Sequence, residues 1–160
     1  MAKHPPVPVS DSTHLQAGES LFGDVLIPGV ASADKIVLEK PLSFWGGYDC
    51  NAATIIDRTH PQCGESLAGK IMIMARAKGS SSSSSVLAEA IRNGTGPVGI
   101  VLGERDLIIA IGAIVAAELY GLVVPVVCLA PNDFDRIAGS KGALRIEAAE
   151  GGGAQVFLDE

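Results

Sequence analysis

The sequence predicts an α/β domain built of three layers in the order β/β/α. Short apolar runs bounded by glycine and proline fill the first half of the chain, which is typical of β-rich structure. In the second half such runs alternate with helix-like segments, and this alternation indicates parallel strands joined by right-handed crossovers. We expect all 160 residues to form a single domain, with residues 1–15 as a loose, proline-containing tail.

The first half is predicted to contain four strands. Residues 22–28 and 35–39 are apolar runs that glycine or proline delimits. Residues 42–45 form a third candidate, because a Gly-Gly turn signal follows them, and residues 53–56 form a fourth. These strands would supply the β-rich part of the domain, against which the second half packs.

The second half is predicted to contain five strands and three helices. The strands cover residues 70–75, 98–102, 123–129, 143–148 and 155–158. The helices cover residues 83–93, 106–120 and 132–138. Asp106 fits the N-cap of the second helix, Gly94 and Gly121 fit the ends of the first two, and Pro131 or Asn132 opens the third.

The composition argues against two classes of partner. Hydrophobic residues make up 48% and charged residues 19%, so a disordered chain is not expected. A net charge of −6 argues against binding to nucleic-acid phosphates. The apolar tract 107–130 is long enough to cross a membrane, but Glu118, Gly121 and Pro125 interrupt it, so that we expect a buried helix and strand and no membrane partner.

Cysteine usage agrees with a reducing compartment. The three cysteines form no C-x-x-C pair, and no apolar leader precedes the predicted core. Cys128 lies in an apolar run and is predicted to be a small core residue, whereas Cys50 and Cys63 lie in polar loop sequence. We therefore expect a cytoplasmic location and no metal site within this chain.

A run of six serines, residues 80–85, lies where the strand 70–75 meets the helix 83–93, and Gly79 precedes it. Helix N-termini favour negative charge, so these hydroxyls can cap the helix, bind an anion or act on a substrate. The helix dipole contributes about 0.3–1 kcal/mol, less than the roughly 1.4 kcal/mol of one pKa unit. A serine that acts as a base here therefore needs positive charge from a cation or metal elsewhere.

A second cluster, residues 41–49, contains the only tryptophan of the chain. Trp45 is followed by Gly46 and Gly47, and Asp49 comes two residues later. The cluster is either an apolar anchor before a tight turn or a loop that lines a cleft or a partner surface. Both interpretations stay open on the composition alone.

His60 is the one histidine outside the predicted tail. It follows Asp57 and Arg58, a setting that suits acid–base chemistry, but no nucleophile is paired with it. A structural histidine in a polar loop is the preferred interpretation. A carrier domain phosphorylated on His60 is an alternative, and it requires an exposed histidine on a mobile loop.

Five motifs follow one another between residues 41 and 127. They are Pro-Leu-Ser-Phe-Trp-Gly-Gly, Ile-Ile-Asp-x-x-His-Pro, Gly-Glu-Ser-Leu-Ala-Gly-Lys, Gly-Ser-Ser-Ser and Ala-Glu-Leu-Tyr-Gly-x-x-x-Pro-Val-Val. This series resembles the small subunit, or swivel domain, of the aconitase X family. The resemblance implies a swivelling β/β/α fold, similar to the mobile last domain of aconitases. It also implies a hydro-lyase that removes water from a small hydroxy acid.

The resemblance implies roles for the residues of two motifs. Ser80, the first serine after the glycine, matches the base that takes the substrate proton. Gly79, Ser81 and Ser82 would bind the substrate, and the two serines can also cap the helix. The loop that faces the cleft or the partner would contain Trp45, Gly46, Gly47 and Asp49.

The resemblance places the metal centre outside this chain. A large subunit, or a fused larger domain, would carry the cysteine ligands of an iron–sulfur or iron centre, so this chain alone would bind no cofactor. Its partners would be the aconitase X large subunit and the small hydroxy acid, and it would be inactive without that subunit. The metal would supply the positive charge that Ser80 lacks.

Three positions depart from the family pattern, since Cys50 replaces a proline, Ala53 a glycine and Lys78 an arginine. These changes bear on substrate and activity and leave the expected fold unchanged. Two substrates are candidates: cis-3-hydroxy-L-proline, as in bacterial members, and mevalonate 5-phosphate, as in archaeal members. The low charged fraction favours the first. A non-catalytic binding module on the same fold is a further alternative.

Overall fold

The computed structural model describes residues 15–159, so that almost all of the predicted tail, residues 1–15, lies outside the described residues. The strands are β1 (Ser20–Ile27), β2 (Gly29–Ala33), β3 (Lys35–Leu38), β4 (Tyr48–Asp49), β5 (Thr54–Ile55), β6 (Ile71–Met74), β7 (Gly99–Leu102), β8 (Val126–Cys128), β9 (Leu144–Ala148) and β10 (Ala154–Leu158). The helices are α1 (Phe44–Gly47), α2 (Ser81–Asn93), α3 (Leu107–Tyr120) and α4 (Pro131–Ala138).

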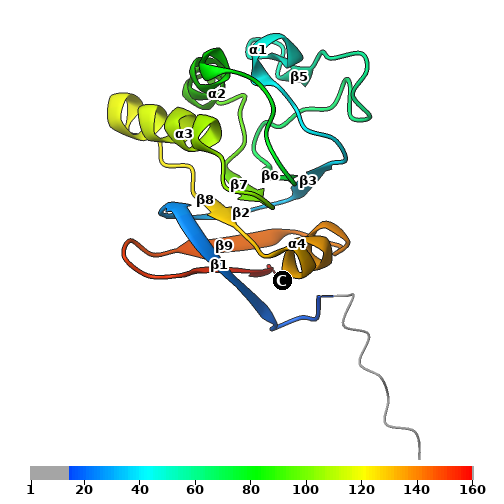
Figure 1. Ribbon diagram of the computed structural model, residues 1–160, viewed down its shortest axis with the longest axis vertical. Coiled ribbons are helices and arrows are strands. Elements are labelled where there is room, and N and C mark those ends of the chain that lie inside the picture. Colours follow the sequence, from blue (N-terminus) through cyan, green and yellow to red (C-terminus); the bar gives the residue numbers. More distant parts are fainter. Residues whose placement is uncertain (1–14, 160) are drawn as a thin grey trace, which may run out of the picture.

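The three predicted layers are present. Eight strands follow the hydrogen-bonded order β2-β9-β10-β1-β8-β7-β6-β3. Strands β3, β6, β7 and β8 are parallel, and β1, β2, β9 and β10 pair antiparallel. The long strand β1 joins the two parts, because its first half pairs with β10 and its second half with β8. Figure 1 shows the antiparallel part beneath the parallel part, with α2 and α3 on the opposite face.

The core consists of two apolar clusters, one on each face of the parallel strands. Successive residues of β6 alternate between them: Ile71 and Ile73 pack against the antiparallel layer, and Met72 and Met74 pack against the helices. All four β6 residues are fully buried. Parallel strands covered on both faces are expected to be apolar throughout, and this explains the continuous run that the sequence shows.

The predicted ends of the long helices are confirmed. The Asp106 carboxylate accepts a hydrogen bond from the Ile109 N–H at 2.8 Å and so caps α3. Gly94 and Gly121 end α2 and α3 in left-handed conformations, with φ of 72° and 66°. Pro131, one of the two residues predicted to open the third helix, is the first residue of α4.

The predicted strand at residues 42–45 is wrong. Leu42 and Phe44 are fully buried anchors, and the segment turns at α1 because Gly46 adopts a φ of 77°. The side chains alternate as a strand would, but the glycine pair reverses the chain before a ladder can form. The strand predicted at 53–56 shrinks to β5, which pairs only with β4.

Other boundaries moved by a few residues. The strand predicted at 123–129 is the shorter β8, and α2 begins two residues before the predicted residue 83. Strand β2 was not predicted, because Gly-Val-Ala-Ser-Ala carries almost no apolar alternation. The tract 107–130 divides into α3 and β8 as expected. No helix within residues 15–159 combines the length and the apolarity needed to cross a membrane.

Candidate active-site edge

The candidate site lies at one edge of the parallel strands. Because β6, β7 and β8 run in the same direction, their carboxyl ends lie at this edge. The helices that follow the three strands also begin here. Ligands of open α/β sheets bind outside the carboxyl ends of the strands. The loops meet closely here, since a Cβ built on Gly103 after β7 would lie 2.9 Å from the Ala75 carbonyl oxygen after β6.

Ser80 occupies the N-cap of α2, with φ −107° and ψ −176°. Its carbonyl accepts a hydrogen bond from the Ser83 N–H at 2.9 Å, but its hydroxyl makes no capping bond. Ser80, Ser81 and Ser82 are all exposed. The hydroxyl proposed for chemistry is therefore not used to hold the helix, unlike the side chain of Asp106 at the start of α3.

Gly79 is required at its position by two side chains. Its φ is +119°, which L-residues rarely adopt. A Cβ there would lie 2.4 Å from the Ser83 hydroxyl oxygen and 2.7 Å from the Ser43 hydroxyl oxygen. The glycine thus lets two serines from distant segments pack directly beneath the loop that presents Ser80.

Ser83 and Ser43 join the serine run to the tryptophan loop. The Ser83 hydroxyl is 3.3 Å from the Ser43 hydroxyl and accepts from the Trp45 N–H at 3.2 Å. Ser43 in turn donates to the Trp45 carbonyl at 3.0 Å. No sequence pattern indicated that these two segments are in contact. Ser83 was missed because nothing distinguishes it from its serine neighbours until helical periodicity turns it inward, where it is 1% exposed.

The serine run therefore has two functions that its composition hides. Ser83 and Ser84 are buried structural residues, and Ser84 donates to the Ile108 carbonyl at 2.7 Å, which fixes α2 against α3. The exposed members are Ser80, Ser81, Ser82 and Ser85. Only the exposed hydroxyls can meet a substrate.

Trp45 lies beside the exposed serines. Its side chain is 65% exposed. It lines a cavity of about 320 Å³ together with Cys50, Ser82, Ser85, Val86 and Glu89. The tertiary structure thus brings the predicted cleft loop and one predicted substrate-binding serine to a common depression.

The other members of the predicted loop have separate positions. Gly46 is open on its Cβ side, whereas a Cβ on Gly47 would lie 3.0 Å from the Leu42 side chain. The Asp49 carboxylate accepts from the N–H groups of Asn51 and Ala52, both at 2.9 Å. The Ala52 and Asn51 N–H groups hold the pKa of that carboxyl below its ordinary value, so Asp49 stabilises a turn.

The departures from the family pattern lie around this turn and loop. Ala53 has a φ of 57°, a left-handed conformation in which glycine is favoured. The Cys50 thiol donates to the Val86 carbonyl at 3.3 Å, and burial raises its pKa. Lys78 is exposed in the loop that leads to Gly79.

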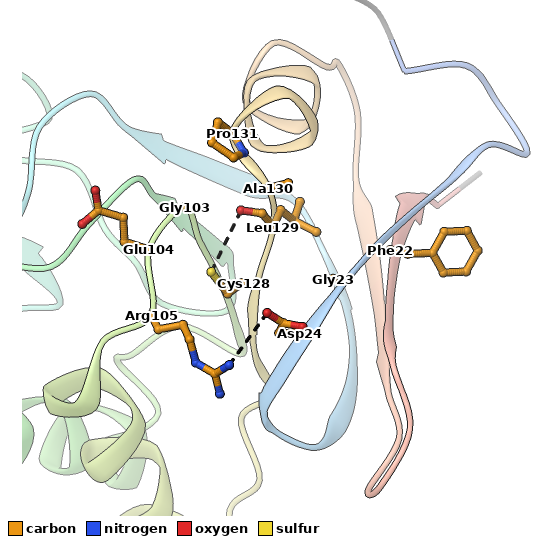
Figure 2. Close-up of a pocket in the computed structure, with 10 residues that line it drawn as sticks. All are labelled: Phe22, Gly23, Asp24, Gly103, Glu104, Arg105, Cys128, Leu129, Ala130 and Pro131. Atoms are coloured by element: carbon orange, nitrogen blue, oxygen red, sulfur yellow. Dashed lines mark hydrogen bonds and ion pairs between the residues drawn. The ribbon is translucent and has the colours of Figure 1, made fainter.

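A larger cavity of about 480 Å³, which the sequence did not reveal, opens at the same edge near β7 and β8. The Arg105 guanidinium and the Asp24 carboxylate, which both line it, form an ion pair at 3.8 Å, as Figure 2 shows. Cys128 lies at its wall with a pKa that burial raises. The charged sequence Glu-Arg-Asp, which follows β7 after Gly103, was the available signal. Ser80 does not line this cavity.

His60 is a structural histidine. It is 5% exposed. Its Nδ1 accepts from the Gln62 N–H at 3.0 Å, and its Nε2 lies 2.8 Å from the Lys40 carbonyl oxygen and donates to it. The phosphocarrier alternative required an exposed histidine, and this burial contradicts it. Within residues 15–159, no three His, Cys, Asp or Glu side chains gather as metal ligands.

The β/β/α layers, with a glycine–serine loop at the carboxyl edge, define a swivel-type domain. The chain belongs to the aconitase X swivel-domain family, because the family model described as "Aconitase X swivel domain" matches residues 9–153. A crystal structure of Thermococcus kodakaraensis aconitase X in its holo-form shares the fold. It superposes with a TM-score of 0.70 at 30% identity over 88% of this chain and 99% of that chain.

Two curated relatives illustrate the family. A cis-3-hydroxy-L-proline dehydratase of Pseudomonas aeruginosa is 44% identical over 113 residues, which are 71% of this chain and 19% of that protein. A phosphomevalonate dehydratase small subunit of Pyrococcus furiosus is 36% identical over 80% of this chain and 96% of that protein. The chain thus spans about a fifth of the first relative and nearly all of the second.

Proposed function

We propose that this chain is the swivel part, or small subunit, of an aconitase X-type dehydratase in which Ser80 takes the substrate proton. The single observation that supports this role most strongly is the exposed Ser80 hydroxyl, which sits at the start of α2 without serving as its cap. The close packing of Gly79 on the Ser83 hydroxyl fixes the loop that presents Ser80.

In the proposed reaction the carbon adjacent to the hydroxyl-bearing carbon loses a proton to the ionised Ser80 oxygen, and its C–H electron pair forms the C=C bond. The hydroxide leaves with the C–O electron pair and takes a proton from solvent to become water. The N–H groups of Ser81 and Ser82, in the first turn of α2, are suited to receive a substrate carboxylate. An iron-containing centre on the large subunit would assist the leaving hydroxyl and supply positive charge.

The dipole of α2 cannot ionise Ser80 alone. It contributes about 0.3–1 kcal/mol, which is less than the roughly 1.4 kcal/mol that shifts a pKa by one unit. The exposed side chains of Arg76 and Lys78 in the preceding loop add positive charge from this chain. Screening by water limits their effect until a partner covers the edge. The chain is therefore proposed to be inactive by itself and to become active when the large subunit closes over Ser80.

The proposed substrate is cis-3-hydroxy-L-proline, with mevalonate 5-phosphate as the alternative. The 44% identity to the Pseudomonas dehydratase supports the first, and identities of 35% to 41% to phosphomevalonate dehydratase small subunits keep the second as the alternative. The proposed compartment is the cytoplasm, in keeping with the free cysteines Cys50, Cys63 and Cys128.

The test is co-purification of this chain with the large subunit of the same organism, followed by dehydration assays with both acids. Ser80→Ala should lower kcat by about 10²–10⁴-fold while the complex still assembles. Ser32→Ala, an exposed serine on β2, is the matched control and should retain full turnover. Near-normal turnover of the Ser80→Ala complex would reject Ser80 as the base. Absence of turnover with either acid would reject the dehydratase assignment.

A further inference from the structure

Helix α3 exposes an apolar face, unlike its neighbour α2. Leu107, Ile111 and Ile114 follow the spacing of one helix face and are 77%, 46% and 46% exposed. We call these three residues the α3 stripe. Helix α2 lies on the same face of the sheet, but its exposed residues are polar: Ser81, Ser82, Ser85, Arg92 and Asn93.

The inner face of α3 shows why the stripe is unusual. A Cβ on Gly112 would lie 2.9 Å from both the Leu87 side chain and the Ser84 carbonyl oxygen, so that the two helices pack closely. Ala113 and Ala116 are fully buried on the same side. Ile109 and these small residues thus face the core, while Leu107, Ile111 and Ile114 face outward. A helix that is apolar on all sides is normally covered on all sides.

The stripe begins at the candidate site. The Ser84 hydroxyl donates to the Ile108 carbonyl at 2.7 Å, so the first turns of α2 and α3 lie side by side. Leu107, the most exposed stripe residue, therefore lies at the same edge as Ser80. A body that covers Ser80 and extends along α3 would bury the whole stripe.

We propose that the α3 stripe is the surface on which the large subunit docks, an inference that rests on the proposed function. The relatives argue for this occupant over a second copy of the chain. The matched region is 19% and 21% of two cis-3-hydroxy-L-proline dehydratases. In these proteins the same polypeptide therefore contains a much larger part besides the region that this chain matches. In Pyrococcus the matched protein is itself named a small subunit. Both arrangements join this domain to a much larger body.

The chemistry of the stripe defines its receptor. No charged side chain interrupts the helix surface from Leu107 to Ile114, and Glu118 is the first acidic residue on this face. The receiving surface is therefore apolar and uncharged opposite the stripe, with a polar contact at Glu118. Lasting interfaces have such apolar centres and polar rims.

The test measures binding of the large subunit of the same organism to purified variants by calorimetry. Ile111→Lys and Ile114→Lys should each raise the Kd by at least about 10-fold, because a lysine ammonium would be buried without a partner in the complex. Val30→Lys, 60% exposed on β2, is the matched control and should bind like the wild type. Leu107→Ser serves as a gentler stripe variant, and thermal unfolding confirms that each variant folds.

The outcomes separate this inference from the proposed function. Wild-type affinity in all three stripe variants overturns the docking surface, even if the complex dehydrates a substrate. A stripe-dependent complex that dehydrates neither acid supports docking and rejects the dehydratase assignment. Failure of the wild-type chain to bind the large subunit overturns docking, as does a self-association that Ile111→Lys abolishes while large-subunit binding persists.

Discussion

Gly79 lies directly over the Ser83 hydroxyl, and a Cβ at position 79 would be 2.4 Å from that oxygen. The contact explains why a glycine precedes the serine run. It couples the loop that presents Ser80 to the buried hydroxyl that also holds the Trp45 loop. The Ser83 hydroxyl thus lies beneath the exposed Ser80 loop and also holds the Trp45 loop.

Gly79→Ala should destabilise the chain by about 1–3 kcal/mol, because the left-handed φ and the contact with Ser83 both penalise a methyl group. Gly64→Ala is the matched control, since Gly64 has a φ of +90° with nothing within 4 Å of its Cβ position. Denaturant unfolding would measure both. Equal losses in the two variants would show that the contact with Ser83 adds nothing to the conformational strain.

Ser83→Ala should cost about 0.5–1.5 kcal/mol, because the Trp45 N–H would lose its acceptor in a part-buried setting. The only tryptophan of the chain makes its fluorescence a direct report on this loop. Ser81→Ala, an exposed neighbour that does not line the cavity at Trp45, should change stability by less than about 0.5 kcal/mol and leave the spectrum unchanged. An unaltered spectrum in Ser83→Ala would contradict the proposed coupling.

Ser80→Ala should leave stability almost unchanged, although N-cap substitutions usually cost about 0.5–2 kcal/mol. The reason is that the Ser80 hydroxyl makes no capping bond. Asp106→Ala, at the N-cap of α3, should show the usual loss, because its carboxylate accepts from the Ile109 N–H at 2.8 Å. Urea titrations compare the two caps. A similar loss for Ser80 would mean that its hydroxyl holds the helix.

Ala53→Gly should stabilise the chain by about 0.5–1 kcal/mol, because Ala53 has a φ of 57° and glycine reaches this conformation without strain. Ala52→Gly, the adjacent turn residue, should instead destabilise slightly through a more flexible unfolded chain. The midpoints of thermal unfolding report both changes. A loss of stability in Ala53→Gly would be inconsistent with strain at this position.

The stability difference between wild type and Asp49→Asn should depend on pH. The Ala52 and Asn51 N–H groups lower the pKa of the folded Asp49 carboxyl, so its stabilising effect is fully present above the unfolded pKa of about 4. The effect should disappear as the pH falls through the lowered folded pKa. Unfolding free energies measured from pH 6 to pH 2.5 provide the comparison. A difference that grows on acidification would refute this sign.

The sequence alone determined the layers and most elements of the domain. Strict strand–helix alternation predicted the parallel part, and the caps at Asp106, Gly94 and Gly121 were correctly placed. These signals are local, since periodicity and capping depend on residues a few positions apart. The motif series likewise indicated the aconitase X family, which the match over residues 9–153 confirms.

Only the tertiary structure decided how the serine run is divided. A uniform run gives no local signal for which hydroxyls are buried, so the inward positions of Ser83 and Ser84 depend on where α2 packs. The meeting of Ser83 with Ser43 joins residues 40 positions apart, and no pattern in the sequence encodes that contact. The turn at residues 42–45 and the exposed stripe on α3 have the same origin. In each case burial is set by what lies against the segment, which is a property of the folded chain.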